Sequence, residues 1–331
     1  MLDMVNTLLK SSTVPSQASV EGALADCESY ARALYESVED AGPKDENTPA
    51  STLLSLEKQQ QGSSRPAQSV GMTRVTREKV VDKLSTLAYS IVSDPKVFIT
   101  PTALASYVAT QCLIGRPETL SQVFVLYSSK PIPRPGSSPA KFKPASPFKA
   151  SSAVPYVLAD AALTAAIEAK NLPLCLDIIN TSVCATAFNR NKLIRRALLP
   201  ATAAALAPVA AFVLASQLSV YQDNMDQTAA RNLIFAGTLA YMGFTSVLGI
   251  VALTTRNDQM NRITWAIGLP LRERWLREEE RALVDRVAAA WGFQEETRRG
   301  EEEGQEWEAL REWVGLRGMV LDRVSSMDGM E

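Results

Sequence analysis

Leu198–Val220 reads LLPATAAALAPVAAFVLASQLSV and Leu233–Thr254 reads LIFAGTLAYMGFTSVLGIVALT, so two apolar stretches without a charged residue lie close together. As α-helices, with a rise of about 1.5 Å per residue, both are long enough to cross a hydrocarbon core of roughly 30 Å. The segment between them is too short for anything but a turn. Residues 191–256 are therefore predicted to form a two-pass transmembrane hairpin, in which small residues such as Ala240 and Gly243 let the helices approach closely.

Cations stand at both outer ends of the predicted hairpin, whereas the loop at its tip carries two acids, Asp223 and Asp226. By the positive-inside rule, both soluble flanks then face the cytoplasm or its topological equivalent, the mitochondrial matrix. A hairpin buried in a soluble core would be equally hydrophobic all round, but the chain offers too few amphipathic helices to cover one. The membrane-flanking basic residues are Lys192, Arg195, Arg196, Arg256 and Arg262.

Several residue types and motifs that carry enzyme chemistry are missing from the sequence. The chain has no histidine, which excludes histidine-based nucleophilic catalysis and histidine-ligated metals. It also lacks the glycine motifs that bind phosphates, and its four cysteines form no C-x-x-C pair. The many acids of residues 277–312 are typical of a solvated helix face. We therefore predict a non-enzymatic protein with no catalytic residue, cofactor, metal or small-molecule substrate.

The chain before the hairpin divides into two parts by composition. Residues 1–70 are predicted to be mostly disordered, with one amphipathic helix over about 19–40. Residues 71–190 are predicted to form a helical domain in which two helix pairs turn at Gly115–Pro117 and at Lys170–Pro173. This unit of about 33 residues resembles a pentatricopeptide or tetratricopeptide repeat. An ordinary α-helical bundle is the alternative.

Residues 130–152, KPIPRPGSSPAKFKPASPFKASS, are rich in proline and basic residues and contain no acid. Such a stretch buries too little apolar surface to fold, so a mobile basic loop is predicted. It is either a plain surface linker or an arm that contacts the phosphates of RNA, ribosomal RNA or anionic lipid. The candidate phosphate contacts are Lys130, Arg134, Lys141, Lys143 and Lys149.

Residues 257–331 form a charged, helical C-terminal region that contains all five tryptophans. Apolar residues recur at helical spacing over about 270–291 and 300–323, which predicts a C-terminal α-hairpin. Two helices make a thin core, so some aromatic surface is expected to remain for a partner.

Four of the tryptophans have a predicted role. Trp265 follows the second span closely and is expected in the interfacial belt of the membrane. Trp291 lies on the apolar stripe of its helix and is expected to be buried. Trp307 and Trp313 are the candidate anchors for a protein partner, and Trp313 stands out because it falls off the apolar line.

The arrangement resembles a group of fungal mitochondrial inner-membrane proteins without an assigned activity. The resemblance lies in RNKLIRRALLP before the first span, and in PLRERWLREEERALVDRVAAAWGF and RRGEEEGQEWEALREWVGLRGMVLDR after the second. It implies that both termini lie in the matrix and that the protein takes part in mitochondrial gene expression or in the assembly of respiratory complexes.

The sequence thus predicts an all-α protein with a helical-repeat-like soluble region, a two-helix transmembrane hairpin and a C-terminal α-hairpin. Its predicted function is a membrane-anchored scaffold or tether that recruits a matrix partner, such as the mitochondrial ribosome or an assembly intermediate. A small transport or channel subunit of a larger membrane complex is the alternative. Only uncharged polar residues are available in the spans for such a role: Ser216, Gln217, Thr238, Thr245 and Ser246.

Overall fold

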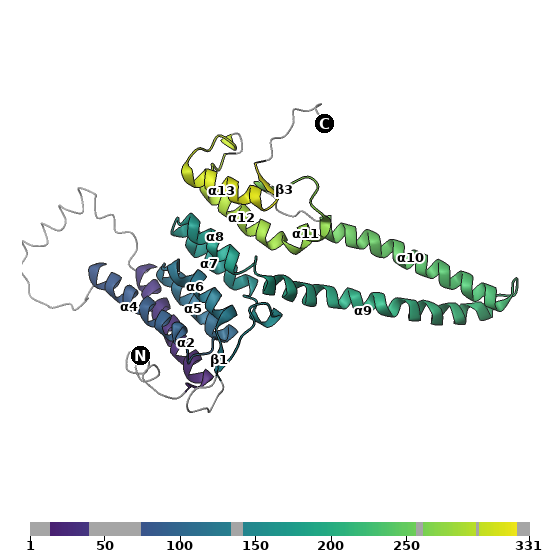
Figure 1. The fold of residues 1–331 in the computed structure, drawn as a ribbon, viewed down its shortest axis with the longest axis horizontal. Helices are drawn as coiled ribbons and strands as arrows, with labels where there is room; N and C mark the ends of the chain where they lie inside the picture. The colour runs from purple at the N-terminus through teal and green to yellow at the C-terminus, as the bar shows by residue number, and fades with distance from the viewer. Residues whose placement is uncertain (1–13, 40–73, 134–141, 256–260, 296–297, 323–331) are drawn as a thin grey trace, which may run out of the picture. The chain divides into compact units, whose positions relative to one another are not determined.

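The computed structural model describes residues 14–39, 74–133, 142–255, 261–295 and 298–322 (Figure 1). It is mostly helical, with 74% helix and 4% strand, which confirms the prediction of a helical protein. The chain divides into two compact units, residues 1–145 and 146–331. The division lies inside the proline-rich segment, so the two predicted helix pairs of residues 71–190 belong to different units.

Unit 1 is a helical unit in which α2 packs against α4 and α5, and α6 packs against α4 and α5. Its core contains Leu24, Leu104, Tyr107 and Phe124, all fully buried. The amphipathic helix predicted over about 19–40 is therefore part of a folded unit. The helices of unit 1 are α2 (Gln17–Glu39), α4 (Arg74–Ser93), α5 (Pro101–Ile114), η1 (Pro117–Thr119) and α6 (Leu120–Ser129).

Local signals set the ends of α5 as the sequence predicts. The Thr100 hydroxyl accepts the N–H of Ala103 at 3.1 Å, and Pro101 fills the first turn, where no donor is needed. Gly115 ends the helix in the left-handed region, with φ +69°, where a residue without Cβ pays no steric penalty. The chain then turns into η1 and α6.

The proline-rich segment is structured at both of its ends. β1 (Ile132–Pro133) pairs antiparallel with β2 (Phe142–Lys143), and η2 (Ala150–Ser152) follows. The Arg190 guanidinium donates to the carbonyl of Phe148 at 3.0 Å, which ties the stretch before η2 to α9. The prediction of a wholly mobile loop is therefore wrong for these residues, because backbone pairing and a side-chain tie replace the missing apolar burial. Residues 134–141 lie outside the described part.

Unit 2 contains a helical layer, a long helix pair and a C-terminal region. Leu283 and Val287 of α12 are fully buried where this helix packs against α7 and α8. The Asn171 side chain accepts the N–H of Leu174 at 3.1 Å and begins α8 at the break that the sequence predicts. The helices are α7 (Tyr156–Glu168), α8 (Leu172–Thr181), α9 (Thr186–Leu218), η3 (Ser219–Tyr221), α10 (Gln227–Thr255), α11 (Leu271–Leu276), α12 (Glu278–Trp291) and α13 (Gln305–Leu316).

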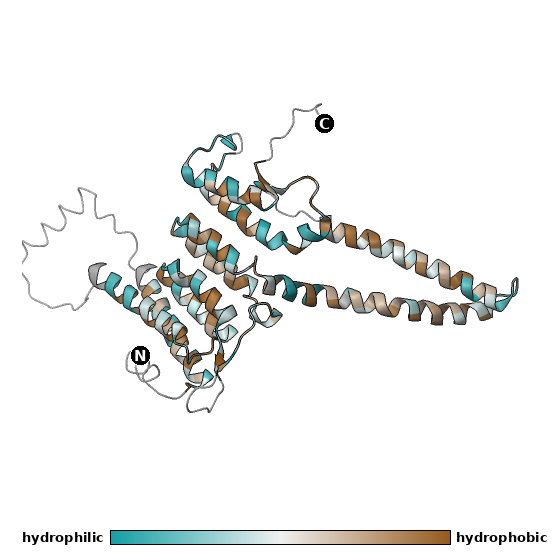
Figure 2. Ribbon diagram, viewed as in Figure 1, coloured by the Kyte–Doolittle hydropathy of each residue, from teal (hydrophilic) through white to brown (hydrophobic). Residues whose placement is uncertain are grey.

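The helices α9 and α10 run side by side and are joined by a short turn (Figure 1). Apolar residues follow both helices over most of their length (Figure 2). Small buried side chains at a spacing of four form their contact: Ala211 and Ala215 of α9 and Ser219, the first residue of η3. Ala240 and Gly243 are exposed, so the prediction that they form the contact is wrong. The close approach uses the half of the pair nearest the turn instead.

The C-terminal region, residues 261–322, differs from the predicted α-hairpin. β3 (Ile263–Trp265) pairs antiparallel with β4 (Met319–Leu321), and Trp265 lies opposite Met319. The predicted second helix over 300–323 is shorter, because α13 begins after Gly304 (φ +134°) and ends before Gly318 (φ +72°). These backbone conformations favour glycine and turn the chain from helix into strand.

Candidate functional site

Arg262 lies at the centre of the C-terminal region, and only 1% of its side chain is exposed. Its Nε and Nη2 donate to the two carboxylate oxygens of Asp322 at 2.9 and 2.6 Å. Nη2 also donates to Glu302 at 2.5 Å, and the guanidinium lies over the Trp307 ring, 4.6 Å from its centroid. A buried cation of this kind needs both carboxylates, because it has lost its hydration. The three charges join the two ends of the region.

Asp285 of α12 holds the start of β3 through the backbone. Its Oδ1 accepts the N–H groups of Arg262 and Ile263 at 2.7 and 2.8 Å, and its Oδ2 accepts that of Asn261 at 3.0 Å. The buried Arg281 guanidinium donates to the carbonyl of Ile263 at 3.1 Å. One helix therefore supplies both the acceptor and the donor that fix the strand.

Glu302 bridges the ion-pair centre and a neighbouring loop. It accepts the N–H of Phe293 at 2.9 Å and that of Gly300 at 2.8 Å. Desolvation is the largest influence on Glu302 and raises its pKa, but the Phe293 N–H, the Arg262 guanidinium and the Gly300 N–H together lower the pKa to about 2. A Cβ at Gly292 would lie 1.5 Å from Nη1 of Arg262, so this close approach requires glycine.

A second buried carboxylate, Glu280, joins two arginines. Arg277 donates to it through Nε and Nη2 at 2.9 and 3.0 Å, and Arg317 donates at 2.9 Å. Burial raises the pKa of Glu280, but the two guanidinium groups outweigh it and hold the pKa below its usual value. Arg317 also lies over the Trp313 ring, 4.0 Å from its centroid. The half-buried Trp313 is thus tied to the ion pairs.

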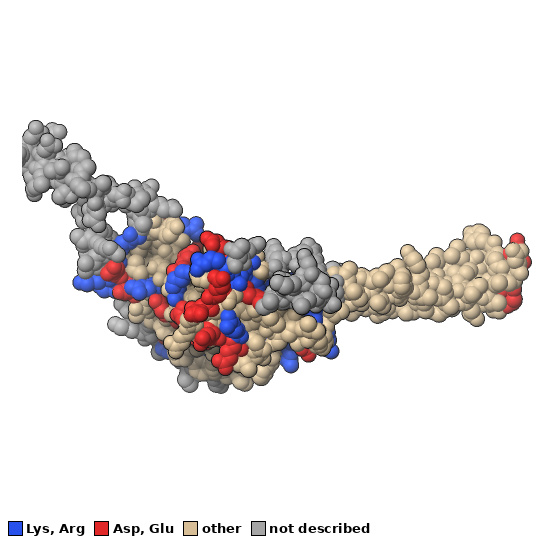
Figure 3. Space-filling view, turned by 90° about the horizontal axis from the view of Figure 1, so that it is seen from above, with Lys and Arg blue, Asp and Glu red and all other residues tan. Residues whose placement is uncertain are grey.

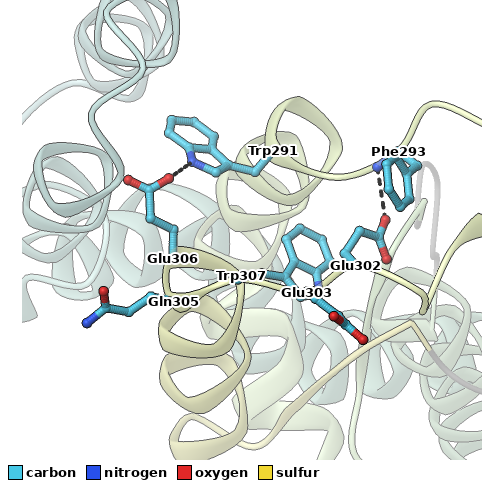
Figure 4. A pocket seen from close by; sticks show the side chains of 8 residues that line it. Trp291, Phe293, Glu302, Glu303, Gln305, Glu306 and Trp307 are labelled. Atoms are coloured by element: carbon cyan, nitrogen blue, oxygen red, sulfur yellow. Dashed lines mark hydrogen bonds between the residues drawn. The ribbon is translucent and has the colours of Figure 1, made fainter.

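A pocket of about 350 Å³ opens beside the ion-pair centre (Figure 4). Trp291, Phe293 and Trp307 form its aromatic walls, and the exposed acids Glu303 and Glu306 line it. The Trp291 indole N–H donates to Glu306 at 2.9 Å. The buried Nε1 of Trp307 has no hydrogen-bond partner among the described residues. The pocket therefore offers aromatic side chains and negative charge.

The tryptophans differ from their predicted roles. Trp291 is only partly buried, so the prediction of a core residue is wrong; the Leu283 and Val287 positions of its stripe form that core instead. Trp307 is 4% exposed, so it is no exposed anchor, although its ring lines the pocket. Trp265 is buried in β3 and donates to Glu278 at 3.0 Å, which is not the environment of an interfacial belt.

The membrane-flanking cations fall into two groups. Lys192 is buried and pairs with Glu279 while it lies over the Trp275 ring, and Arg262 is buried as described above. Neither is a surface charge, so the prediction that these two residues flank the membrane as free cations is wrong. Arg195 and Arg196 are exposed. Arg256 lies outside the described residues.

The candidate phosphate contacts of the proline-rich segment differ in their exposure. Lys130 is buried and donates to the carbonyl of Val92 at 2.6 Å, and burial lowers its pKa to about 8. It is unsuited to contact a phosphate, which corrects the prediction. Lys143 and Lys149 are exposed. Arg134 and Lys141 lie outside the described part.

The buried carboxylates were missed by the sequence analysis, which interpreted the acids of 277–312 as a solvated face. Glu280, Asp285 and Glu302 are all buried. Arg277 and Glu280 are three residues apart, a spacing that brings two side chains together on one helix, so the sequence indicates this ion pair. No local sequence pattern indicates the pairing of Arg262 with Asp322, which are sixty residues apart. Among the described residues, no group of three or more Cys, Asp or Glu side chains is placed to hold a metal ion.

Comparison with known proteins gives no match: no family model fits the chain, and neither a curated protein nor a solved structure is similar to it.

Proposed function

We propose that the protein is a non-enzymatic scaffold anchored in a membrane by α9 and α10, and that it recruits a protein partner through its C-terminal region. The burial of the apolar helices carries the proposal. Only 6% of the most apolar part of α9 and 0% of that of α10 is buried, although both are long enough to cross a bilayer. So large an apolar surface in contact with water would be strongly unfavourable.

A third segment, Ala150–Glu168, is also long and apolar enough to cross a membrane. It is 39% buried, and Ala159, Ala162 and Leu163 of its helix α7 lie in the core of unit 2. We therefore assign this segment to the soluble part. Two spans remain, and both flanks of the pair lie on one side of the membrane.

The charges favour the orientation in which the flanks face the matrix of the inner mitochondrial membrane. The face of the α9–α10 pair seen in Figure 3 carries no charge along its length, and acids appear at its far end. These acids belong to the turn, which contains Asp223 and Asp226, whereas the exposed Arg195 and Arg196 lie at the base. The positive-inside rule then favours a base that faces the cytoplasm or its topological equivalent, which is the matrix in the proposed inner mitochondrial membrane.

The aromatic pocket supports a protein partner with a basic side chain. A lysine or arginine of the partner is attracted to the acids Glu303 and Glu306. The rings of Trp291 and Phe293 each already have a cation of this chain over one face, Lys170 at 5.2 Å and Arg298 at 3.9 Å, so they contribute apolar contact to the partner's side chain. A component of the mitochondrial ribosome or of a respiratory-complex assembly intermediate is the proposed partner.

The test is quantitative affinity purification of the full chain from mitochondria in mild detergent. The variant Glu303→Gln/Glu306→Gln removes two acids of the pocket, and Glu308→Gln/Glu312→Gln removes two exposed acids of α13 outside it. We expect a partner whose recovery falls about tenfold or more with the first variant and is unchanged with the second, as for loss of two charge-assisted contacts. Equal recovery of every partner with both variants would show that the pocket recruits none of them.

A further inference from the structure

A second pocket, of about 420 Å³, lies at the base of the α9–α10 pair. It is formed by the first residues of α7 and the chain before them, by one face of α9, and by Glu279 of α12. The position of the pocket along α9 can be read from the sequence. Arg195 precedes Leu198, where the charge-free stretch begins, by three residues, or about 4.5 Å along the helix. The pocket therefore lies where the apolar part of α9 ends.

The charges in this pocket leave an unbalanced positive excess. Lys192 and Glu279 pair within it, and Lys192 also donates to the carbonyl of Leu276 at 3.3 Å. Arg196 reaches the same Glu279 at 3.1 Å while 61% of its side chain stays exposed. Arg195 has no ion pair or hydrogen bond among the described residues. The residues that line the pocket thus include three cations and one carboxylate, and the two exposed arginines are open to a ligand.

The rest of the pocket is amphipathic. Val154 and Phe188 form a buried apolar floor. The phenol of Tyr156 lines it as well, and its hydroxyl has no hydrogen-bond partner among the described residues. Next to these polar groups, Val157 is 74% exposed and Ile194 is 55% exposed. A polar, cationic cavity is thus bordered by apolar surface that faces outward.

We propose that this pocket binds the phosphate of an anionic phospholipid, with Arg195 and Arg196 contacting the phosphate and Tyr156 donating a hydrogen bond. The inference rests on the proposed membrane insertion of α9 and α10. A phosphodiester supplies the negative charge that the pocket lacks, and its acyl chains would cover Val157 and Ile194. A soluble phosphate has the same charge but leaves this apolar surface in water, which favours the lipid.

The experiment uses native mass spectrometry of the full chain purified in an uncharged detergent. The protein is titrated with phosphatidylglycerol, with phosphatidylcholine of the same chain length, and with inorganic phosphate. The variant Arg195→Gln/Arg196→Gln removes the proposed contacts, and Arg272→Gln/Arg311→Gln removes the same charge from exposed positions outside the pocket. Thermal melts of both variants establish that they fold like the parent.

We expect one phosphatidylglycerol to bind each chain in preference to phosphatidylcholine. Its affinity should fall about tenfold or more in Arg195→Gln/Arg196→Gln and stay unchanged in the control, since charge-assisted contacts to phosphate are lost only in the first. Equal binding of the two lipids, equal binding of inorganic phosphate, or an unaltered Arg195→Gln/Arg196→Gln variant would each overturn the proposal. These outcomes leave membrane insertion standing, whereas release of the parent chain from membranes by alkaline carbonate would overturn both.

Discussion

The α9–α10 pair and the C-terminal region of unit 2 distribute polar and apolar groups in opposite ways. Along the pair, large apolar residues such as Leu206 and Phe244 are exposed, and the buried contact is made by Ala211 and Ala215. In the C-terminal region, Arg262, Arg281, Glu280, Asp285 and Glu302 are buried. One part is therefore suited to a lipid environment, and the other to water with an interior held by ion pairs.

The two parts therefore depend on different interactions for their stability. The pair needs little specific pairing, because an apolar surface in lipid has no charge to satisfy. The C-terminal region needs every partner, because a buried charge without its counterion costs several kcal/mol. Substitutions of equal size should therefore have unequal effects in the two parts.

The largest effect is expected from Arg262→Met, which leaves Asp322 and Glu302 without their shared cation. Breaking a buried pair in this way should lower the free energy of unfolding by about 3–5 kcal/mol. Thermal melts of the full chain in detergent measure it, with Arg272→Met at an exposed position as the control. A similar, small loss of stability in both variants would show that the ion-pair centre does not hold the region together.

A smaller effect is expected from Ala211→Leu/Ala215→Leu, which enlarges two fully buried side chains between α9 and α10. Overpacking of this kind should cost about 1–3 kcal/mol and separate the helices. The matched change Ala240→Leu/Gly243→Leu adds similar volume at exposed positions and should be tolerated. Resistance to proteolysis in detergent distinguishes the two, and greater damage from the second variant would show that the helices pack through Ala240 and Gly243 instead.

A further effect appears only at acidic pH. The pKa of Glu302 is about 2 in the folded chain and 4.5 ordinarily, so the folded state favours the ionised form. Its contribution to stability is fully present above about pH 4.5 and is lost as the pH falls through 2. Melting temperatures of the parent should therefore fall more steeply between pH 4.5 and 2 than those of Glu302→Gln. Parallel curves for the two proteins would contradict this account of Glu302.

Local patterns predicted the helical fold well. The turns at Gly115 and Asn171 were foreseen because their capping signals lie within a few residues. The apolar character of α9 and α10 follows from local composition in the same way, but both helices begin earlier than the predicted spans, at Thr186 rather than Leu198 and at Gln227 rather than Leu233. The division at residue 145 and the inclusion of α2 in unit 1 depend on packing between distant helices, which no local pattern contains.

The candidate site was harder to predict. The tryptophans lie in the region that the sequence indicates, but the exposures of Trp291 and Trp307 are the reverse of the prediction. Trp291 lies at the last residue of α12, where its ring lines a pocket and meets the Lys170 side chain of the α7–α8 turn. The pairing of β3 with β4 and of Arg262 with Asp322 joins residues about sixty positions apart. The prediction that Lys130 is a surface cation is wrong because its acceptor, the carbonyl of Val92, lies 38 positions away in sequence, and no local pattern indicates it.

Insertion of α9 and α10 into a membrane is tested most directly by alkaline carbonate extraction of the full chain from isolated mitochondria. Carbonate releases proteins that only adhere to a membrane, and it leaves those whose apolar helices lie within the bilayer. We predict that the chain stays in the membrane pellet with an integral marker, while a peripheral marker appears in the supernatant. Recovery of the chain in the supernatant would contradict the membrane anchor and require another cover for the exposed apolar faces of the pair.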